Sequence, residues 1–259
     1  MFKKVSFIAI LFTVVAFNTS SASIENKYVK SGEKLTFIAS FNVSGVMTDI
    51  AEVKMETSIV KTKSRELLRL KCTASTYSNW DKFFKVRDLY ESYVDTETLL
   101  PVLYKRSIEE GSYKKELKYL FKRKSKIAIS TLNKKGYKDF KTEVPITDTT
   151  LDIVSTIYNA RILDYDNFSV GKKIIKKLIV DSEVQTVTIE YLGKEKITMG
   201  NYGKKECYKL SIGFGGSEIE NIKGGKYIYI TADKDRLPAL IEATIPVGRV
   251  QIRLSHYSK

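Results

Sequence analysis

The stretch at residues 34–43, KLTFIASFNV, alternates between apolar and polar side chains and decides the fold class. Its apolar face carries Leu35, Phe37, Ala39, Phe41 and Val43, its other face carries Lys34, Thr36, Ser40 and Asn42, and Ile38 is the exception. A period of two residues is typical of a β-strand with one buried and one solvated face. The sequence therefore predicts a half-buried strand here.

The same alternation recurs along the chain at residues 68–74, 117–122 and 250–255. Further strand candidates run near residues 50–60, 83–94, 99–108, 126–132, 172–180, 184–192, 195–200, 205–212, 225–232 and 237–244. Short connections rich in glycine separate them, which favours antiparallel pairing. A sheet of up to about a dozen strands curls strongly.

One stretch, residues 148–163, breaks this period and predicts a helix that begins behind Asp148 or Thr149 as N-cap. The apolar residues that recur there at helical spacing are Leu151, Val154, Ile157, Tyr158 and Ile162. Their stripe must be buried, and a curved sheet offers its concave face or its open end. We therefore expect a mainly β protein with a single antiparallel, strongly curved sheet or incomplete barrel, and one substantial helix packed on or inside it.

The first 23 residues have the layout of a secretory signal peptide, with Lys3 and Lys4 before an apolar run and small residues after it. The apolar run is shorter than the ~20 residues needed to cross a bilayer as a helix. Neither cysteine lies near the cleavage region, so we expect no lipid anchor there. The prediction is an exported, periplasmic protein that is not an integral membrane protein, with one barrel-like domain at residues 24–259.

The formal net charge of +14 is spread along the chain and favours anionic partners. Phosphate-bearing glycolipids, acidic polysaccharides and anionic membrane surfaces fit both this charge and export, whereas nucleic acid does not fit export. An AT-rich genome also produces many Lys, Ile, Asn and Tyr codons. The charge by itself therefore does not identify the partner.

Reactive groups are scarce, because His256 is the only histidine in the sequence. Because this residue lies three positions from the C-terminus, imidazole-based triads and multi-histidine metal sites are largely unavailable, and no phosphate-binding or dinucleotide motif is present. We expect no metal and no cofactor. Asp88, Glu91 and Asp95 share one strand candidate, where Asp88 points away from the other two, although a glycosidic pair must face each other. These patterns predict a non-enzymatic protein.

The two cysteines, Cys72 and Cys207, both lie in strand-like runs with apolar neighbours. A disulfide can form outside the cytoplasm, and two buried thiols acting as small apolar groups fit the pattern equally well. The sequence leaves both alternatives open.

Several separated blocks resemble those of one exported bacterial family, in the same order. They are FFKVRDLYESYVD at 83–95 with LLP at 99–101, EGSY at 110–113, DTTLDIVSTIYNAR at 148–161 and DRLPALIEA at 235–243. The chain is similar in these blocks to domain of unknown function 3108. The resemblance implies an antiparallel, barrel-like sheet like those of exported capsule-associated proteins and, distantly, periplasmic lipoprotein carriers, with no established activity.

Six residues are candidates for binding a ligand: Trp80, Arg87, Tyr158, Arg161, Tyr227 and Tyr229. A tyrosine face combines apolar area with polar tips, so Tyr227 and Tyr229 could line a barrel or simply cover its outside. Arg161 could reach an anionic headgroup at the barrel mouth or stabilise the helix end. Trp80 is expected at a strand connection, and Arg87 has a structural alternative as an ion-pair partner.

The leading hypothesis is a protein that binds, or helps to assemble, an envelope component such as a lipid, a lipoprotein or a glycan. The second is a structural or interaction protein of an envelope complex, and an enzyme acting on polysaccharide ranks last. A large apolar cavity would support the first hypothesis. A filled core with an exposed apolar patch would support the second.

Overall fold

The computed structural model describes residues 25–43, 45–134, 140–215, 225–245 and 248–259. The predicted signal peptide, residues 1–23, lies outside the described residues. Within these residues, no helix is long and apolar enough to cross a bilayer.

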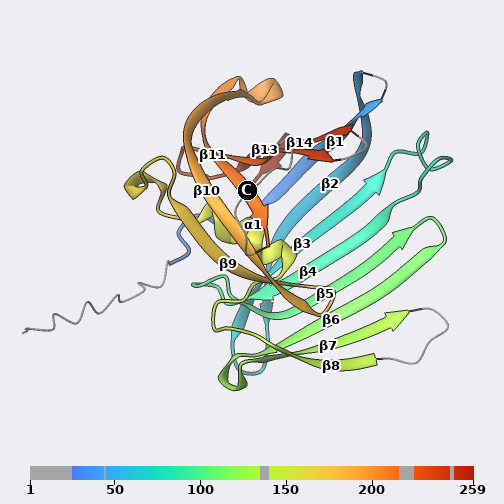
Figure 1. Ribbon diagram of the computed structural model, residues 1–259, viewed down its shortest axis with the longest axis vertical. Coiled ribbons are helices and arrows are strands. Elements are labelled where there is room, and N and C mark those ends of the chain that lie inside the picture. Colours follow the sequence, from blue (N-terminus) through green and yellow to red (C-terminus); the bar gives the residue numbers. More distant parts are fainter. Residues whose placement is uncertain (1–24, 44, 135–139, 216–224, 246–247) are drawn as a thin grey trace, which may run out of the picture.

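The described residues form one antiparallel sheet of 14 strands in the order β8-β7-β6-β5-β4-β3-β2-β1-β14-β13-β12-β11-β10-β9 (Figure 1). The strands are β1 (Lys34–Val43), β2 (Val46–Lys61), β3 (Glu66–Thr76), β4 (Arg87–Val94), β5 (Pro101–Glu110), β6 (Tyr113–Lys122), β7 (Ile127–Lys134), β8 (Phe140–Pro145), β9 (Lys173–Val180), β10 (Glu183–Thr198), β11 (Lys204–Phe214), β12 (Lys226–Thr231), β13 (Pro238–Ile245) and β14 (Gly248–Ser258). Helix α1 (Ile153–Arg161) and three short 3₁₀ turns, η1 (Arg123–Ser125), η2 (Tyr165–Asn167) and η3 (Gly200–Tyr202), complete the secondary structure of these residues.

The sheet is strongly curved but does not close, because β8 and β9 at its two edges are not hydrogen-bonded to each other. The first and last strands of the described chain pair in its middle, with Leu35 opposite Tyr257 and Phe37 opposite Leu254. The predicted fold class, a mainly β protein with a single curved antiparallel sheet and one helix, is confirmed.

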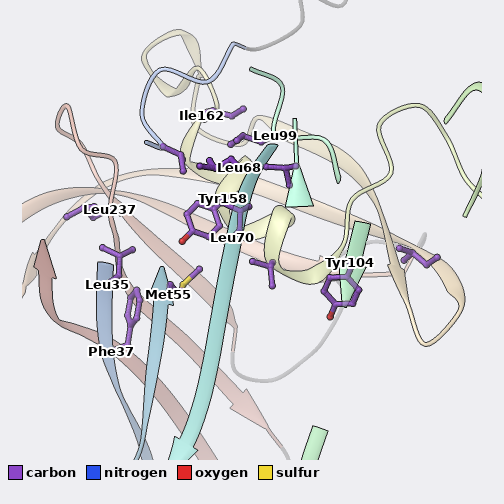
Figure 2. Packing of buried hydrophobic residues seen from close by; sticks show 14 of the residues in the cluster. Leu35, Phe37, Met55, Leu68, Leu70, Leu99, Tyr104, Tyr158, Ile162 and Leu237 are labelled. Carbon is purple, nitrogen blue, oxygen red and sulfur yellow. The ribbon is translucent and has the colours of Figure 1, made fainter. Parts of the chain in front are cut away.

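Helix α1 lies inside the curve and buries two faces. Val154, Tyr158 and Ile162 pack into the larger core beside strands β1–β7, where Tyr158 lies close to Leu70 (Figure 2). Ala160 belongs to a second core formed with β9–β12. The helix therefore separates the two halves of the interior.

The helix starts later than predicted, with Asp152 rather than Asp148 or Thr149 as its N-cap. The reason is tertiary: Leu151 is held in an extended bridge to β9, its N–H donating to Lys177 O at 2.8 Å and its carbonyl accepting from Ile179 N at 2.9 Å. A residue held by such a bridge cannot also be helical.

Three strand predictions also need correction. The candidates at 184–192 and 195–200 form the single strand β10, which carries an irregularity between Tyr191 and Lys194. Residues 83–86 precede β4 instead of belonging to it, because Phe83 and Phe84 donate backbone hydrogen bonds to Trp80 O in a turn. Strand β8 was not predicted at all.

Candidate functional site

An apolar pocket of about 410 Å³ lies inside the sheet beside α1. Its lining comes from α1 and from strands β9–β13: Ile153, Thr156, Ile157, Ala160, Leu178, Val180, Gln185, Val187, Ile189, Ile212, Phe214, Ile228 and Ile241. Thr156 and Gln185 are the polar members. A pocket of this size and character falls in the range that binds small molecules, which usually lies near 300–1,000 Å³.

The walls of the pocket follow from the strand pleat. Val187 pairs with Phe214 and Ile189 with Ile212, so alternate residues of β10 and β11 place their side chains side by side on the concave face. Helix α1 supplies the facing wall with Ile153 and Ile157. Amphipathic strands and an amphipathic helix thus enclose a space that is apolar on both sides.

The N-terminus of α1 is fixed by a buried capping box. Asp152 accepts a hydrogen bond from Ser155 N at 2.8 Å, and Ser155 Oγ accepts one from Asp152 N at 2.9 Å. The Ser92 hydroxyl on β4 donates to the same carboxylate at 2.6 Å. Burial raises the pKa of Asp152 to about 6, and these hydrogen bonds to the ionised form oppose that rise. The contacts tie the helix to the sheet.

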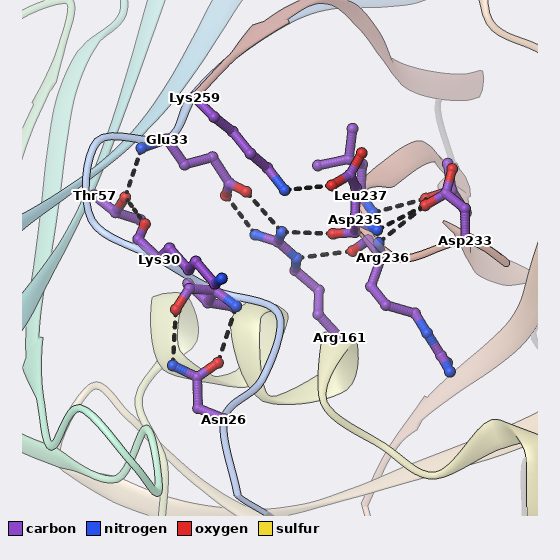
Figure 3. A network of polar contacts seen from close by, with 12 residues as sticks. Asn26, Lys30, Glu33, Thr57, Arg161, Asp233, Asp235, Arg236, Leu237 and Lys259 are labelled. Atoms are coloured by element: carbon purple, nitrogen blue, oxygen red, sulfur yellow. Dashed lines mark hydrogen bonds and ion pairs between the residues drawn. The ribbon is translucent and has the colours of Figure 1, made fainter.

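The C-terminus of α1 closes one end of the interior through a buried ion pair (Figure 3). Arg161 donates to both carboxylate oxygens of Glu33, at 2.6 and 2.8 Å, and its side chain has no exposed surface. The same guanidinium donates to Arg236 O at 2.8 Å and to Asp235 O at 3.0 Å. The N-terminal segment, the helix and the β12–β13 turn are thereby joined.

The pocket opens at the other end, where Phe214 is 49% exposed and Gln185 is exposed. The β9–β10 turn, adjoining Val180 and Gln185, covers the gap between the two arms of the sheet by polar contacts. Asp181 accepts from Arg106 at 2.5 Å and from Lys115 at 2.7 Å. Ser182 N donates to the Tyr119 hydroxyl at 3.0 Å. Polar side chains thus connect the β9–β10 turn to β5 and β6 across the interior of the open sheet.

The six candidates from the sequence do not meet at this pocket, and none of them lines it. Trp80 and Arg87 lie at the β3–β4 turn, where Trp80 Nε1 donates to Asp49 O at 3.1 Å and Arg87 forms an ion pair with Asp81. Tyr227 and Tyr229 lie on the opposite face of β12 from Ile228, which lines the pocket.

The two candidates on α1 are both fully buried. The Tyr158 hydroxyl has no hydrogen-bond partner in the structure, and burial raises the pKa of Tyr158. Arg161 is at the closed end, against Glu33, and not at a mouth. That placement leaves Arg161 no surface for a headgroup, so the interpretation that it stabilises the helix end fits and the headgroup interpretation does not.

The residues that line the pocket show a hydrophobic periodicity in the sequence, and this periodicity predicts only that their side chains are buried. Ile157 belonged to the predicted helical stripe, and Val187 and Ile189 alternate within a predicted strand. Periodicity shows that a side chain is buried but not whether its neighbour is another side chain or a cavity.

The three carboxylates of the β4 block have structural partners. Arg69 Nε donates to Glu91 at 2.7 Å, Asp88 accepts from Glu109 N at 3.1 Å, and Asp95 accepts from Thr98 N at 2.9 Å. None of them lines the apolar pocket. The absence of enzymatic activity stays a prediction.

Cys72 and Cys207 are free thiols, which resolves the alternative that the sequence left open. Cys72 faces Tyr90 from β3, and Cys207 lies on β11. Burial raises the pKa of each thiol to about 12, so both stay protonated and act as small apolar groups.

Residues 36–255 match the family described as "Protein of unknown function (DUF3108)". No curated protein matches the sequence. Among solved structures, the fold is similar to a β-barrel-like protein of domain of unknown function DUF1849 from Brucella abortus, with a TM-score of 0.56 and 7% identity over 88% of this chain and 97% of that one. A structure described as a "putative lipoprotein" from Parabacteroides distasonis aligns with a TM-score of 0.35 and 9% identity over 88% of this chain and 96% of that one.

Proposed function

The chain belongs to the family of unknown function DUF3108, and we propose from its pocket that it is a non-enzymatic, exported protein that binds the acyl chain of an envelope lipid or lipoprotein. The observation that carries this proposal is the apolar pocket beside α1, whose lining reaches the surface at Phe214 and Gln185. An apolar space that reaches solvent beside Phe214 suits an acyl chain that enters there.

The character of the lining supports an acyl chain over a glycan. Glycans need many hydrogen-bonding partners, and the lining offers only the side chains of Thr156 and Gln185. The Thr156 hydroxyl already donates to Asp152 O at 2.7 Å. Ile157, Val187 and Ile241 instead offer surface that is stabilised by contact with methylene groups, at roughly 25 cal/mol per Å² buried.

For the alternative ligands, a glycan or a protein partner, a charged groove offers more hydrogen-bonding groups than the apolar pocket does. A groove of about 350 Å³ on the outer face of β4–β7 is lined by charged side chains, among them Glu91, Lys105, Glu116 and Lys118. Glu91 is engaged there by Arg69. This groove is the place to examine if the pocket binds nothing.

The proposal is tested by displacement of a fluorescent fatty acid, cis-parinaric acid, from the purified protein by unlabelled hexadecanoate. Saturable binding of one molecule per chain is expected. Ile241→Trp, which places a larger ring in the pocket, should weaken binding at least tenfold. Ile175→Trp is the matched control, because Ile175 is 67% exposed and lies on the strand face opposite Leu178.

The absence of saturable binding by the wild-type protein would contradict the proposal. Equal weakening by the Ile241→Trp and Ile175→Trp variants would also contradict it, because the probe would then be adsorbing outside the pocket. Mass spectrometry of lipids that co-purify from the native compartment would identify the chain that is bound.

A further inference from the structure

Exposed apolar side chains gather at the open end of the curved sheet. Among the described residues, the large hydrophobic side chains exposed at this end are Val46 (66%), Phe83 (80%), Phe84 (57%), Tyr113 (43%), Phe140 (65%) and Phe214 (49%). Scattered single hydrophobic residues need no explanation, but several exposed phenylalanines at one end of the sheet do. We call Phe83, Phe84, Phe140 and Phe214 the aromatic rim.

The topology explains why these residues share one end. Turns of an antiparallel meander alternate between the two ends of the sheet, so the turns β1–β2, β3–β4 and β5–β6 lie at the same end as the last residue of β7 and the first residue of β8. In Figure 1 the tips of the β3–β4 and β5–β6 pairs project to the right, and the tip of β2 points upward above them. Phe214 lies at this end as well. It pairs with Val187, which is close to the β9–β10 turn, and Asp181 in that turn contacts Lys115 near the start of β6.

Each part of the aromatic rim has a lysine beside it. Lys226 Nζ lies 4.9 Å from the centroid of the Phe214 ring, Lys82 precedes Phe83 in the β3–β4 turn, and Lys141 follows Phe140 on the opposite face of β8. Within the described residues, none of these three lysines forms a salt bridge. An apolar ring next to an unpaired ammonium group matches the layering of a membrane surface, where acyl chains lie below anionic headgroups.

The geometry points to a membrane-docking surface: the aromatic rim and Lys82, Lys141 and Lys226 bind the surface of an anionic phospholipid bilayer. The rings enter the boundary between headgroups and acyl chains, and the lysines contact lipid phosphates. Anionic lipid surfaces attract each nearby lysine, and the basic chain adds to that attraction.

Docking in this way also orients the pocket. Phe214 belongs both to the aromatic rim and to the pocket lining, so the open end of the pocket faces the bilayer when the rim is bound. The inference goes beyond the proposed function and depends on different residues, since membrane docking can occur with the pocket filled. The occupant is a lipid surface and not a protein, because the exposed rings come from three separate segments, at residues 83–84, 140 and 214, and the lysines near them match anionic headgroups.

The experiment is co-sedimentation of the purified protein with large vesicles of phosphatidylglycerol and phosphatidylethanolamine, and with vesicles of phosphatidylcholine alone. We expect binding to the anionic vesicles that weakens as salt is raised. Trp80, the single tryptophan, lies 5.8 Å from the Phe83 ring and reports docking directly. Its fluorescence should be quenched by brominated acyl chains.

Two rim variants and one control give the test its specificity. Changing Phe83, Phe84, Phe140 and Phe214 to Ser should weaken anionic-vesicle binding at least about tenfold, and so should changing Lys82, Lys141 and Lys226 to Ser. The control changes four exposed apolar residues away from this end to Ser: Ile59, Leu120, Val170 and Ile175, which are 39–70% exposed. Circular dichroism and urea unfolding confirm that each variant folds.

Vesicle binding that survives in the folded rim variants would overturn the inference, as would equal loss of binding in the control variant. A wild-type protein that binds cis-parinaric acid but neither type of vesicle would overturn the docking surface while leaving the pocket function intact. The Ile241→Trp variant should still sediment with anionic vesicles, which separates the two proposals in the other direction.

Discussion

Glu33 and Arg161, 128 residues apart in sequence, face each other as a bidentate ion pair with less than 2% of either side chain exposed. Arg161 also donates to the carbonyls of Asp235 and Arg236, so one guanidinium joins three distant segments. The pair closes the interior at the end opposite the pocket opening.

The first prediction concerns this pair. Glu33→Leu leaves a buried charge without its partner and should lower the free energy of unfolding by about 3–5 kcal/mol, measured in urea. The double variant Glu33→Leu with Arg161→Met should lose less than the two single variants together. Arg253→Met is the control, because Arg253 and Asp49 are about half exposed and such pairs contribute less than about 1 kcal/mol. A Glu33→Leu effect no larger than the control would show that the buried pair is not needed for stability.

The second prediction concerns pH. Burial raises the pKa of Asp152 in the folded protein to about 6, above its value in the unfolded chain of about 3.9. Between about pH 4 and pH 6, the Asp152 carboxyl is therefore protonated in the folded state and ionised in the unfolded state. The contribution of Asp152 to the free energy of unfolding falls as pH rises through this window, and it is constant above about pH 6.

Asp152→Asn keeps an N-capping side chain and removes the titration. Its stability relative to the wild type should therefore rise between pH 4 and pH 6, by about 2–3 kcal/mol, and then level off. Urea unfolding of both proteins at a series of pH values measures this difference, in which other titrating groups cancel. A difference that does not vary with pH would exclude the shift.

The third prediction concerns the length of the bound chain. Each methylene group that enters the pocket beside Ile157 and Ile189 contributes about 0.8 kcal/mol, which corresponds to an increase in affinity of about fourfold per carbon. Affinity for saturated fatty acids from eight carbons upward should rise on this slope and then reach a plateau when the pocket is full. Displacement of cis-parinaric acid measures the series, and an affinity independent of chain length would argue against binding of the acyl chain in this pocket.

The fourth prediction concerns the β9–β10 turn. Asp181→Ala removes the partner of Arg106 and Lys115, whose side chains are only 10% and 16% exposed, and should lower the free energy of unfolding by about 2 kcal/mol. Amide hydrogen exchange should accelerate in β9 and β10 while β2 and β3 are unchanged. Glu66→Ala, which removes an exposed partner of Lys61, is the control. Uniform acceleration across the sheet would mean that the turn does not hold the barrel shut.

Strand positions were predictable because the pleat is a local property. Alternate residues of a strand, such as Leu35 and Phe37 of β1, point to the same face of the sheet whatever their partner strands are. The alternation of apolar and polar residues in the sequence therefore predicts the strand. The failures occurred where a distant segment decided the outcome. Leu151 is extended because β9 pairs with it, so the helix could not begin where a local N-cap signal placed it.

The candidate site was less predictable for the same reason. Tyr158 and Arg161 were recognised as helix residues with functional potential, but their surroundings depend on Leu70 and Glu33, far away in the sequence. Tyr227 and Tyr229 were assigned to one face of a strand correctly, yet only the sheet shows that this face lies opposite the pocket. Ile228 between them lines the pocket, and neither tyrosine does.

The amino-acid sequence alone determined the mainly β class, the position of the one helix within a few residues and the scarcity of catalytic groups. These properties depend on residue type and on the periodicity of nearby residues, which are local features of the sequence. The tertiary structure decided which apolar faces enclose a pocket, which end of the sheet is open and which arginine is buried against a carboxylate. Those properties arise from contacts between separate elements of the chain, since the pocket lining runs from Ile153 to Ile241 and Glu33 lies 128 positions from Arg161, and the curvature of the sheet brings them together.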